Sequence, residues 1–470
     1  MRVFIAITAF LLTLSAQAYS PVDILPEGSR VGLSVHTPEG NPIEINSEQL
    51  FPPASTLKIV TALAAKLELG NEFRFATSVE ADGDDMIIRF SGDPTLTSHD
   101  LAELLTAAKA NGLKEIKGDI YLNKGTFSGY ERGVGWPWDI LGVCYSAPAS
   151  AITLDENCVQ ASIYTNKDGT TRVHVPEHQP INVSTRATSV SKELQKERQC
   201  ELELITFDNN RYELSGCLTY REKPLPLKFA VQETSLYTGE AIKHILSING
   251  IKFSGKVKTT DNRQGTVLAT NLSAPLPELI DKMLKESDNL IADNLVKTIG
   301  AKFYIQPGSF NNGTEAIKQI VYSHTGINLT TAQLADGSGL SRNNRMSVKS
   351  MTDILNYIWR NDNQLALLQL LPNSGESGTL KYRRSMRKEP VKGHLKAKSG
   401  SLYGSYNMAG YVLDDSGQPK ATFVQFVTDY YPPKRDDNQK ATTPAIFLFE
   451  KAFYTDLIKL SLKNSTKQTH

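Results

Sequence analysis

The sequence predicts an α+β fold in which helices pack on an antiparallel sheet, interrupted by a long strand-rich insertion. Strand-like runs occur near both ends of the chain, at residues 30–36, 42–45, 391–400, 406–413 and 421–427. The first two flank the turn Pro38-Glu-Gly40, and residues 445–462 follow the last run as an amphipathic helix. Strands at both ends with helices around them indicate one mixed core. Strand signals are also dense between residues 77 and 268.

The N-terminus has the organisation of a secretory signal, which we place at residues 1–18. Arg2 supplies the positive charge, residues 3–14 are apolar, and Ala16-Gln-Ala18 is a typical cleavage pattern. We therefore expect the mature protein in the periplasm. Its 40% hydrophobic composition over 470 residues provides enough apolar material for more than one core.

Charge and hydropathy exclude two classes of partner. The formal net charge is +1 and falls to 0 without Arg2, so nothing in the balance favours nucleic-acid binding. After the signal, no segment is apolar enough to predict a transmembrane span. The amphipathic residues 445–462 could serve as a membrane anchor, but Ile446, Phe449, Phe453, Leu457 and Leu460 favour packing of this helix on the sheet.

The first motif with reactive groups is Ser55-Thr-Leu-Lys58. Ser-x-x-Lys occurs three times, at Ser55, Ser189 and Ser385, so the pattern alone is weak. Only Ser55 opens an apolar run rich in helix formers, directly after Phe51-Pro-Pro. Because residues three apart share a helix face, the Lys58 amine is expected within reach of the Ser55 hydroxyl. A plain helix-capping serine is the alternative for Ser55.

Two further polar triplets stand in informative contexts. Ser287-Asp-Asn289 interrupts an apolar helical segment, where small polar residues are costly unless they find partners. We interpret it as the wall of a polar site, with a plain loop or cap between helices as the alternative. Lys398-Ser-Gly400 ends the strand-like run from Val391, and Gly400 allows a ligand backbone to approach closely. A surface lysine at a strand end is the alternative for Lys398.

The four cysteines suit an oxidising compartment. Cys200 and Cys217 flank two strand-like runs and lie symmetrically about the polar turn Asp208-Asn-Asn210. A hairpin in this register places them opposite each other. We predict a Cys200–Cys217 disulfide, which leaves Cys144 and Cys158 as the other pair; reduced buried thiols are the alternative.

One motif suggests a metal and is set aside. His174-Val-Pro-Glu-His178 matches a metalloprotease pattern that requires both histidines on one helical face. Pro176 breaks such a helix, and no set of cysteines and histidines has zinc spacing. We predict neither a metal nor a cofactor.

The three motifs that begin at Ser55, Ser287 and Lys398 occur in the order of the trio found in penicillin-recognising acyl transferases. Asp336-Gly-Ser-Gly-Leu-Ser-Arg342 and Gly135-Trp-Pro-Trp138 add to this pattern. With them the chain resembles the class C low-molecular-mass penicillin-binding proteins of the penicillin-binding protein 4 type. These are the D-alanyl-D-alanine carboxypeptidase/endopeptidases of peptidase family S13. The resemblance covers nearly the whole mature chain.

The resemblance implies a β-lactamase/transpeptidase-like domain with two nested, strand-rich inserted domains. Residues 59–286 are long enough to hold them. We place the catalytic domain at 19–76 and 269–470, inserted domain II at 77–98 and 173–268, and inserted domain III at 99–172.

It also implies an activity and roles for the motif residues. The substrates are peptidoglycan stem peptides that end in D-Ala-D-Ala, and β-lactam antibiotics are inhibitors. Ser55 attacks the carbonyl of the penultimate D-alanine, and a neutral Lys58 accepts its proton. Ser287 relays the proton to the leaving D-alanine, while Asn289 holds the substrate amide or Lys58.

Further residues are expected to bind the substrate. Lys398 and Ser399 hold the terminal carboxylate beside Gly400, and the N–H groups of Ser55 and Ser401 form an oxyanion hole.

Three candidates come from outside the motif trio. Asp139, after Trp138, is the nearest match to the acidic residue that meets a diaminopimelate ammonium in the family; a solvated carboxylate is the alternative. Arg342 is a candidate for a substrate carboxylate, with a salt bridge inside its own loop as the alternative. Tyr403 is a candidate for part of the site wall.

Two other functions are alternatives, a β-lactamase and a non-catalytic peptidoglycan-binding protein. A β-lactamase of class A needs a Glu-x-x-Leu-Asn element after the second motif, and none is present. A non-catalytic peptidoglycan-binding protein has no chemical need for an intact Ser55, Lys58 and Lys398. The sequence therefore favours the peptidase.

Overall fold

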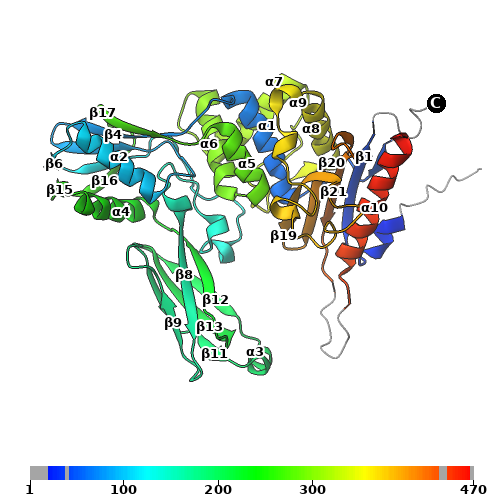
Figure 1. Ribbon diagram of the computed structural model, residues 1–470, viewed down its shortest axis with the longest axis horizontal. Helices are drawn as coiled ribbons and strands as arrows, with labels where there is room; N and C mark the ends of the chain where they lie inside the picture. Colours follow the sequence, from blue (N-terminus) through cyan, green and yellow to red (C-terminus); the bar gives the residue numbers. More distant parts are fainter. Residues whose placement is uncertain (1–19, 38–41, 433–441, 466–470) are drawn as a thin grey trace, which may run out of the picture.

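The computed structural model describes residues 20–37, 42–432 and 442–465. Figure 1 shows three parts: a main domain with one sheet between helices, a second region around its own sheet, and a slender β-rich arm. The predicted signal sequence and the turn at residues 38–40 lie outside the described residues.

The sheet of the main domain joins the two ends of the chain. Its strand order is β19-β20-β21-β1-β2, and all neighbours are antiparallel. The strands are β1 (Arg30–His36), β2 (Ile43–Ile45), β19 (Leu395–Leu402), β20 (Ser405–Leu413) and β21 (Pro419–Thr428). The predicted α+β class and the opening strands are confirmed.

The strand that carries the Lys398 motif starts later than predicted. Val391 lies in a turn, with its N–H donating to the Lys388 carbonyl at 3.1 Å, and Gly393 follows at φ 77°. This left-handed glycine reverses the chain, so β19 begins only at Leu395. Lys398-Ser-Gly400 therefore lies inside the strand and not at its end.

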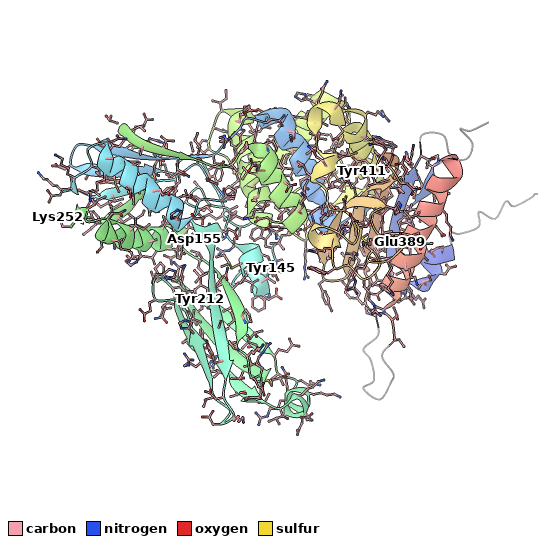
Figure 2. All side chains as sticks on the ribbon, viewed as in Figure 1. Tyr145, Asp155, Tyr212, Lys252, Glu389 and Tyr411 are labelled. Atoms are coloured by element: carbon pink, nitrogen blue, oxygen red, sulfur yellow. A yellow bond between two sulfur atoms is a disulfide. The ribbon has the colours of Figure 1, made fainter. Side chains whose placement is uncertain are left out.

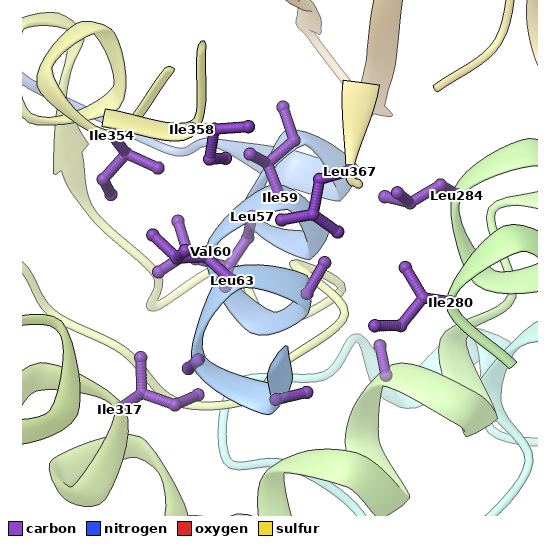
Figure 3. Close-up of a cluster of buried hydrophobic side chains, with 14 of the residues drawn as sticks. Leu57, Ile59, Val60, Leu63, Ile280, Leu284, Ile317, Ile354, Ile358 and Leu367 are labelled. Atoms are coloured by element: carbon purple, nitrogen blue, oxygen red, sulfur yellow. The ribbon is translucent and has the colours of Figure 1, made fainter. Parts of the chain in front are cut away.

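One face of this sheet is covered by a bundle of helices. They are α1 (Lys58–Leu69), α5 (Leu276–Glu286), α6 (Asn289–Tyr304), α7 (Phe310–Thr325), α8 (Val348–Arg360) and α9 (Asp362–Leu365). Figure 3 shows α1 at the centre, with Ile280 from α5, Ile317 from α7 and Ile354 from α8 around it. Helix α1 is surrounded by other elements on all sides. The run after Ser55 therefore has no polar face.

Helix α10 (Ala445–Ser465) covers the opposite face of the sheet (Figure 1). Phe449 and Phe453 are buried, and the Phe453 ring packs edge-on to Phe423 of β21 at 6.3 Å. Ile446 and Leu457 are buried as well, while Leu460 is half-buried. The prediction that this helix packs on the sheet is confirmed. Within the described part of the chain, none of the helices is long and apolar enough to cross a membrane.

The second region is built on a five-stranded sheet with the order β16-β7-β5-β4-β17. Its strands are β4 (Ala76–Asp82), β5 (Asp85–Arg89), β7 (Ile120–Asn123), β16 (Val257–Thr260) and β17 (Thr266–Leu272). Helices α2 (Ser98–Ala110) and α4 (Thr234–Ile248) pack on it, with the small pair β6 (Glu115–Ile116) and β15 (Lys252–Phe253) beside them.

The arm extends away from this region (Figure 1). One of its sheets contains β8 (Cys158–Thr165), β9 (Thr171–His174) and β14 (Leu225–Ala230). The other contains β10 (Asn182–Thr185), β11 (Thr188–Val190), β12 (Leu202–Phe207) and β13 (Arg211–Thr219), with α3 (Lys192–Arg198) at the tip.

This strand grouping differs from the predicted insert boundaries. Strand β7, inside the predicted 99–172 segment, pairs in parallel with β5 after the crossover through α2. Strand β14, inside the predicted 173–268 segment, pairs with β8 of the arm. We propose a division into an outer insert, residues 76–157 and 231–272, and an arm, residues 158–230.

Both predicted disulfides are present. Cys200 and Cys217 join the antiparallel pair β12–β13 near its open end, with Cα atoms 5.6 Å apart. Cys144 and Cys158 are joined with Cα atoms 5.3 Å apart, and the described residues include no free cysteine. The Cys144–Cys158 disulfide links the loop that precedes the arm to β8, the first strand of the arm. The same loop reaches the candidate site.

Candidate active site

Ser55 and Lys58 lie where a short 3₁₀ turn becomes helix α1. The turn spans Ala54–Leu57, and Lys58 is the first residue of α1. The Lys58 Nζ is 3.1 Å from the Ser55 Oγ. The predicted proximity of the two groups is confirmed, although a 3₁₀ turn brings them together before the helix itself begins.

The Lys58 amine has three hydrogen-bond acceptors. Besides Ser55, Nζ contacts Oδ1 of Asn289 and the carbonyl of Ser338, each at 2.7 Å. Its side chain is fully buried. Burial lowers the pKa of Lys58 to about 8, although nearby carboxylates act in the opposite direction. A lysine with such a pKa can exchange a proton near neutral pH.

Two buried carboxylates hold the loop that supplies the Ser338 carbonyl. Asp293 Oδ1 accepts from the N–H groups of Gly337 and Ser338 at 2.9 Å each. Asp336 accepts from the indole N–H of Trp136 at 2.9 Å. Burial holds the pKa of Asp293 well above its usual range. These bonds fix both the loop after Asp336 and the Trp136 loop against α6.

Ser287, Asp288 and Asn289 form the junction of α5 and α6. Ser287 has φ 62°, a left-handed conformation that ends α5. Asp288 caps α6 by accepting from the N–H of Ile291 at 2.9 Å. Asn289 donates from Nδ2 to the Tyr145 carbonyl at 2.7 Å. The triplet is therefore both a helix junction and a wall of the site, which unites the two interpretations of the sequence.

Lys398 reaches the same place from β19. Its fully buried Nζ donates to Ser287 Oγ and to the Ser399 carbonyl, each at 2.9 Å. Burial, with the positive charges of Lys58 and Arg383, lowers the pKa of Lys398 well below its usual range. The Ser399 hydroxyl lies 2.9 Å from Thr379 Oγ1. A bound carboxylate would raise the pKa of Lys398, because an anion stabilises the ammonium form.

Two glycines allow the segments around Ser55 to pack closely. A Cβ atom at Gly400 would lie 2.9 Å from the Ser55 backbone nitrogen. A Cβ atom at Gly339, where φ is +80°, would lie 1.9 Å from the Ala54 carbonyl oxygen. Strand β19 and the loop after Asp336 therefore press directly against the turn that holds Ser55.

A cavity of about 720 Å³ opens above this cluster. Among the predicted site residues, the following line it: Ser55, Asp139, Ser287, Asn289, Arg342, Ser401 and Tyr403. Lys58 and Lys398 are fully buried next to lining residues, and Ser399 and Gly400 belong to the same strand as Ser401. Asp139 and Arg342 are exposed, and Tyr403 is exposed over 77% of its surface.

The sequence analysis gave no site role to five residues that the structure brings to the site. Trp136 and Ser338 belong to motifs that it singled out, whereas Tyr145, Asp293 and Thr379 were missed. Figure 2 shows Tyr145 where the arm meets the main domain. Asp293 carried a usable signal, because it is an acidic residue within the apolar run of α6. Ser338 acts through its carbonyl, which no side-chain pattern reveals.

The comparisons with known proteins agree with this geometry. The model of the D-Ala-D-Ala carboxypeptidase 3 (S13) family matches residues 25–450. The chain belongs to this family. The D-alanyl-D-alanine carboxypeptidase DacB of Haemophilus influenzae is 38% identical over 93% of this chain and 92% of its own. A D-alanyl-D-alanine carboxypeptidase of Actinomadura is 30% identical over 79% of this chain and 72% of its own.

Solved structures show the same fold. The crystal structure of penicillin-binding protein 4 (dacB) from Haemophilus influenzae matches with a TM-score of 0.86 and 37% identity, over 93% of this chain and 98% of that one. The same protein complexed with a β-lactam matches with a TM-score of 0.81 and 35% identity, with the same coverage. The S13 chain described here thus has the transpeptidase-like α+β fold with additional domains, and it is a serine-type carboxypeptidase.

Proposed function

We propose that the protein removes the terminal D-alanine from peptidoglycan stem peptides through an acyl-enzyme on Ser55, and that it also cleaves D,D-cross-links. The observation that carries the proposal is the buried Lys58 amine, 3.1 Å from the Ser55 hydroxyl, with a lowered pKa. Trimming and cross-link cleavage break the same kind of bond, because both have a D-alanyl carbonyl as the point of attack.

In the first half-reaction the neutral Lys58 amine accepts the proton of the Ser55 hydroxyl while Oγ bonds to the carbonyl carbon. The N–H groups of Ser55 and Ser401 donate hydrogen bonds to the oxyanion. Such bonds typically lower the barrier by about 3 kcal/mol. The C–N bond then breaks, and Ser287 gives its hydroxyl proton to the departing amine while it receives the proton that Lys58 took from Ser55. Ser287 suits this role because it lines the cavity and its Oγ is 2.9 Å from the Lys398 Nζ.

In the second half-reaction water adds to the acyl carbonyl, and the bond to Ser55 Oγ breaks. Ser55 Oγ takes up the proton that the water loses, and the shortened peptide leaves. The Lys398 ammonium and the Ser399 hydroxyl are the proposed holders of the terminal carboxylate, with Gly400 between Ser399 and Ser401 on the strand. Asn289 positions Lys58 through a 2.7 Å contact and faces the cavity.

Selection of the stem peptide is assigned to residues at the cavity mouth. Asp139 is exposed there, follows the 85%-exposed Trp138, and is free to meet a substrate ammonium. Arg342 is an exposed cation on the same cavity and suits a substrate carboxylate. Tyr403, which directly follows the last residue of β19, contributes to the wall of the same cavity.

We further propose that the protein works in the periplasm. The signal-like N-terminus and the two disulfides support this location, because disulfides persist in oxidising compartments. The substrate, peptidoglycan, is found in the same compartment.

Benzylpenicillin tests the proposal. Intact mass is measured after mixing the drug with the mature protein and with Ser55→Ala. We expect a persistent adduct on the wild type and none on the variant, together with a loss of carboxypeptidase kcat/KM of roughly a thousandfold or more. Rapid consumption of the drug without an adduct would favour a β-lactamase, and neither adduct nor consumption would favour a binding protein. Peptidase activity retained by Ser55→Ala would refute the mechanism.

A further inference from the structure

A second large cavity, of about 650 Å³, lies between the arm and the junction of α5 and α6. Residues of β12 and β14 line it on the arm side, and residues 286–290 line it on the side of the main domain. The loop residues Val143, Cys144 and Tyr145 complete this part of the lining. Figure 2 shows Tyr145 at this junction. We call the cavity the arm groove.

The arm groove is continuous with the active-site cavity. Tyr145, Ser287 and Asn289 line both of them. Asn289 also connects them through hydrogen bonds, because its Nδ2 donates to the Tyr145 carbonyl and its Oδ1 accepts from Lys58. A molecule bound at Ser55 can therefore extend past these residues into the groove.

Ser287 decides which part of a substrate reaches the groove. Under the proposed function, Ser287 gives its proton to the departing amine, so the space beyond it belongs to the leaving group. When a stem peptide is trimmed, the leaving D-alanine ends at the carboxylate that Lys398 and Ser399 hold. When a cross-link is cleaved, the leaving group is a whole stem peptide, which needs a further binding surface.

The size and the apolar walls of the groove suit such a peptide. Cavities of about 300–1,000 Å³ enclose ligands of several residues' size. The apolar part of the lining comes from both sides of the groove and includes Leu204, Leu227, Phe229 and Leu290. These walls match the hydrocarbon chain that adjoins the departing amine in a diaminopimelate residue.

The arm presents the edges of two strands to the groove. Residues 202–204 of β12 and 226–229 of β14 line it consecutively. Because successive side chains point to opposite faces of a strand, a cavity lined by consecutive residues lies along the strand edge. Among the described residues, β12 pairs only with β13, and β14 pairs with β8 apart from an isolated bridge between Phe229 and Val143. Open strand edges offer backbone N–H and C=O groups to an extended peptide.

The charges in the groove indicate how the peptide is held. Four carboxylates belong to the lining, those of Glu156, Glu203, Glu286 and Asp288. Carboxylates accept hydrogen bonds from peptide N–H groups and repel other anions. Lys228 is the single cation of the lining, is exposed, and makes no ion pair within the part of the chain that the structure describes. A carboxylate of the peptide is therefore expected at Lys228.

We propose that the arm groove binds the leaving stem peptide of a cross-linked substrate, with a carboxylate of that peptide at Lys228. This inference rests on the proposed function. It gives the arm a role in substrate selection, because the groove contributes to the cleavage of cross-links and not to the removal of a terminal D-alanine. The acyl-enzyme is the same in both reactions, so only the leaving side distinguishes them.

Two synthetic substrates with the same acyl stem test the groove. The first is the pentapeptide L-Ala-γ-D-Glu-diaminopimelyl-D-Ala-D-Ala. The second is a cross-linked dimer, in which the D-alanyl carbonyl of this stem is joined to the diaminopimelate amine of a second stem. In Lys228→Glu we expect kcat/KM for the dimer to fall roughly tenfold or more, because repulsion replaces a charge-assisted hydrogen bond. The kcat/KM for the pentapeptide should stay at the wild-type value.

The controls separate this proposal from the proposed function. Lys223→Glu makes the same change at an exposed lysine of the arm outside the groove lining, and it should leave both reactions unchanged. The benzylpenicillin adduct on each variant shows that its fold and Ser55 are intact, and Lys228→Gln serves if Lys228→Glu does not fold.

Three results would overturn the groove assignment: an unchanged dimer reaction in Lys228 variants that form the adduct, an equal fall for both substrates, or a wild type that hydrolyses only the pentapeptide. A wild type that neither hydrolyses the pentapeptide nor forms the adduct would instead contradict the proposed function.

Discussion

Lys58 and Lys398 illustrate how much of this site depends on burial. Each side chain is fully buried, and desolvation is the largest cause of its lowered pKa. The Asp293 and Asp336 carboxylates partly offset this lowering at Lys58, while the positive charges of Lys58 and Arg383 lower the pKa of Lys398 further. Lys58 is therefore suited to accept a proton near neutral pH, and Lys398 is suited to bind an anion.

The rate of acylation should therefore rise with pH. Lys58 accepts a proton only when neutral, and with a pKa of about 8 its neutral fraction increases as the pH rises from 6 to 9. From pH 6 to 7 the rate should increase about tenfold, from pH 7 to 8 roughly fivefold, and above pH 8 it should level off, because the neutral fraction of Lys58 follows this course. Formation of the benzylpenicillin adduct, followed by intact mass, measures this rate.

A matched variant identifies the titrating group. Lys58→Arg keeps the positive charge but cannot lose its proton near neutral pH, so its acylation should be very slow throughout. A flat wild-type profile between pH 6 and 9 would show that Lys58 is not the proton acceptor.

Residue identities in this site were predictable from sequence, but their partners were not. In the motifs that begin at Ser55, Ser287 and Lys398, the residue types alone indicate the reactive side chains. The Ser338 carbonyl is a backbone atom placed by a loop, and Tyr145 also contributes a carbonyl. Such contacts depend on tertiary packing, which local patterns do not encode.

At the scale of the elements, the loop after Asp336 packs against the 3₁₀ turn Ala54–Leu57 and so positions Ser55. Gly339→Ala should displace this turn, because the added Cβ would lie 1.9 Å from the Ala54 carbonyl oxygen. A shift of about 1 Å at the reacting atoms costs roughly 100-fold in rate. We expect a loss of this size in benzylpenicillin acylation, measured by intact mass.

Gly326→Ala is the matched control for this change. Gly326 also has a positive φ, +74° against +80° at Gly339, but nothing lies within 4 Å of a Cβ placed there. The control carries a similar backbone strain without the collision. Equal acylation rates in the two variants would mean that the close approach is unimportant.

The elements also show where sequence reasoning succeeded and failed. The hairpin that aligns Cys200 with Cys217 was predictable, because register follows from residues near in sequence. Strand β7 pairs in parallel with β5, and α2 connects the two strands. An alternating pattern of apolar residues does not show whether a strand pairs in this way or in a hairpin with the next strand. The proposed division keeps this pairing within one unit, whereas the predicted 99–172 segment separates β7 from β5.

At the scale of the whole molecule, the arm is inserted through two neighbouring strands. Strands β8 and β14 pair side by side, with Cys158 opposite Ala230 and Ile163 opposite Leu225. The arm therefore leaves and rejoins the outer insert at one place. Chain segments with close ends can often be removed without disturbing the rest of a fold. The partners of Lys58 and Lys398 all lie outside residues 158–230.

Two deletions test the proposed division of the chain. In the first, Asn-Gly replaces residues 164–224 and closes β8 and β14 as a hairpin. This protein should fold and acquire the benzylpenicillin adduct at a rate similar to the wild type, because Ser55 keeps its surroundings. In the second, removal of residues 99–172 takes away β7, which pairs with both β5 and β16. That protein should be insoluble. Soluble expression and intact mass report both outcomes, and an arm deletion that fails to fold would show that the main domain depends on the arm.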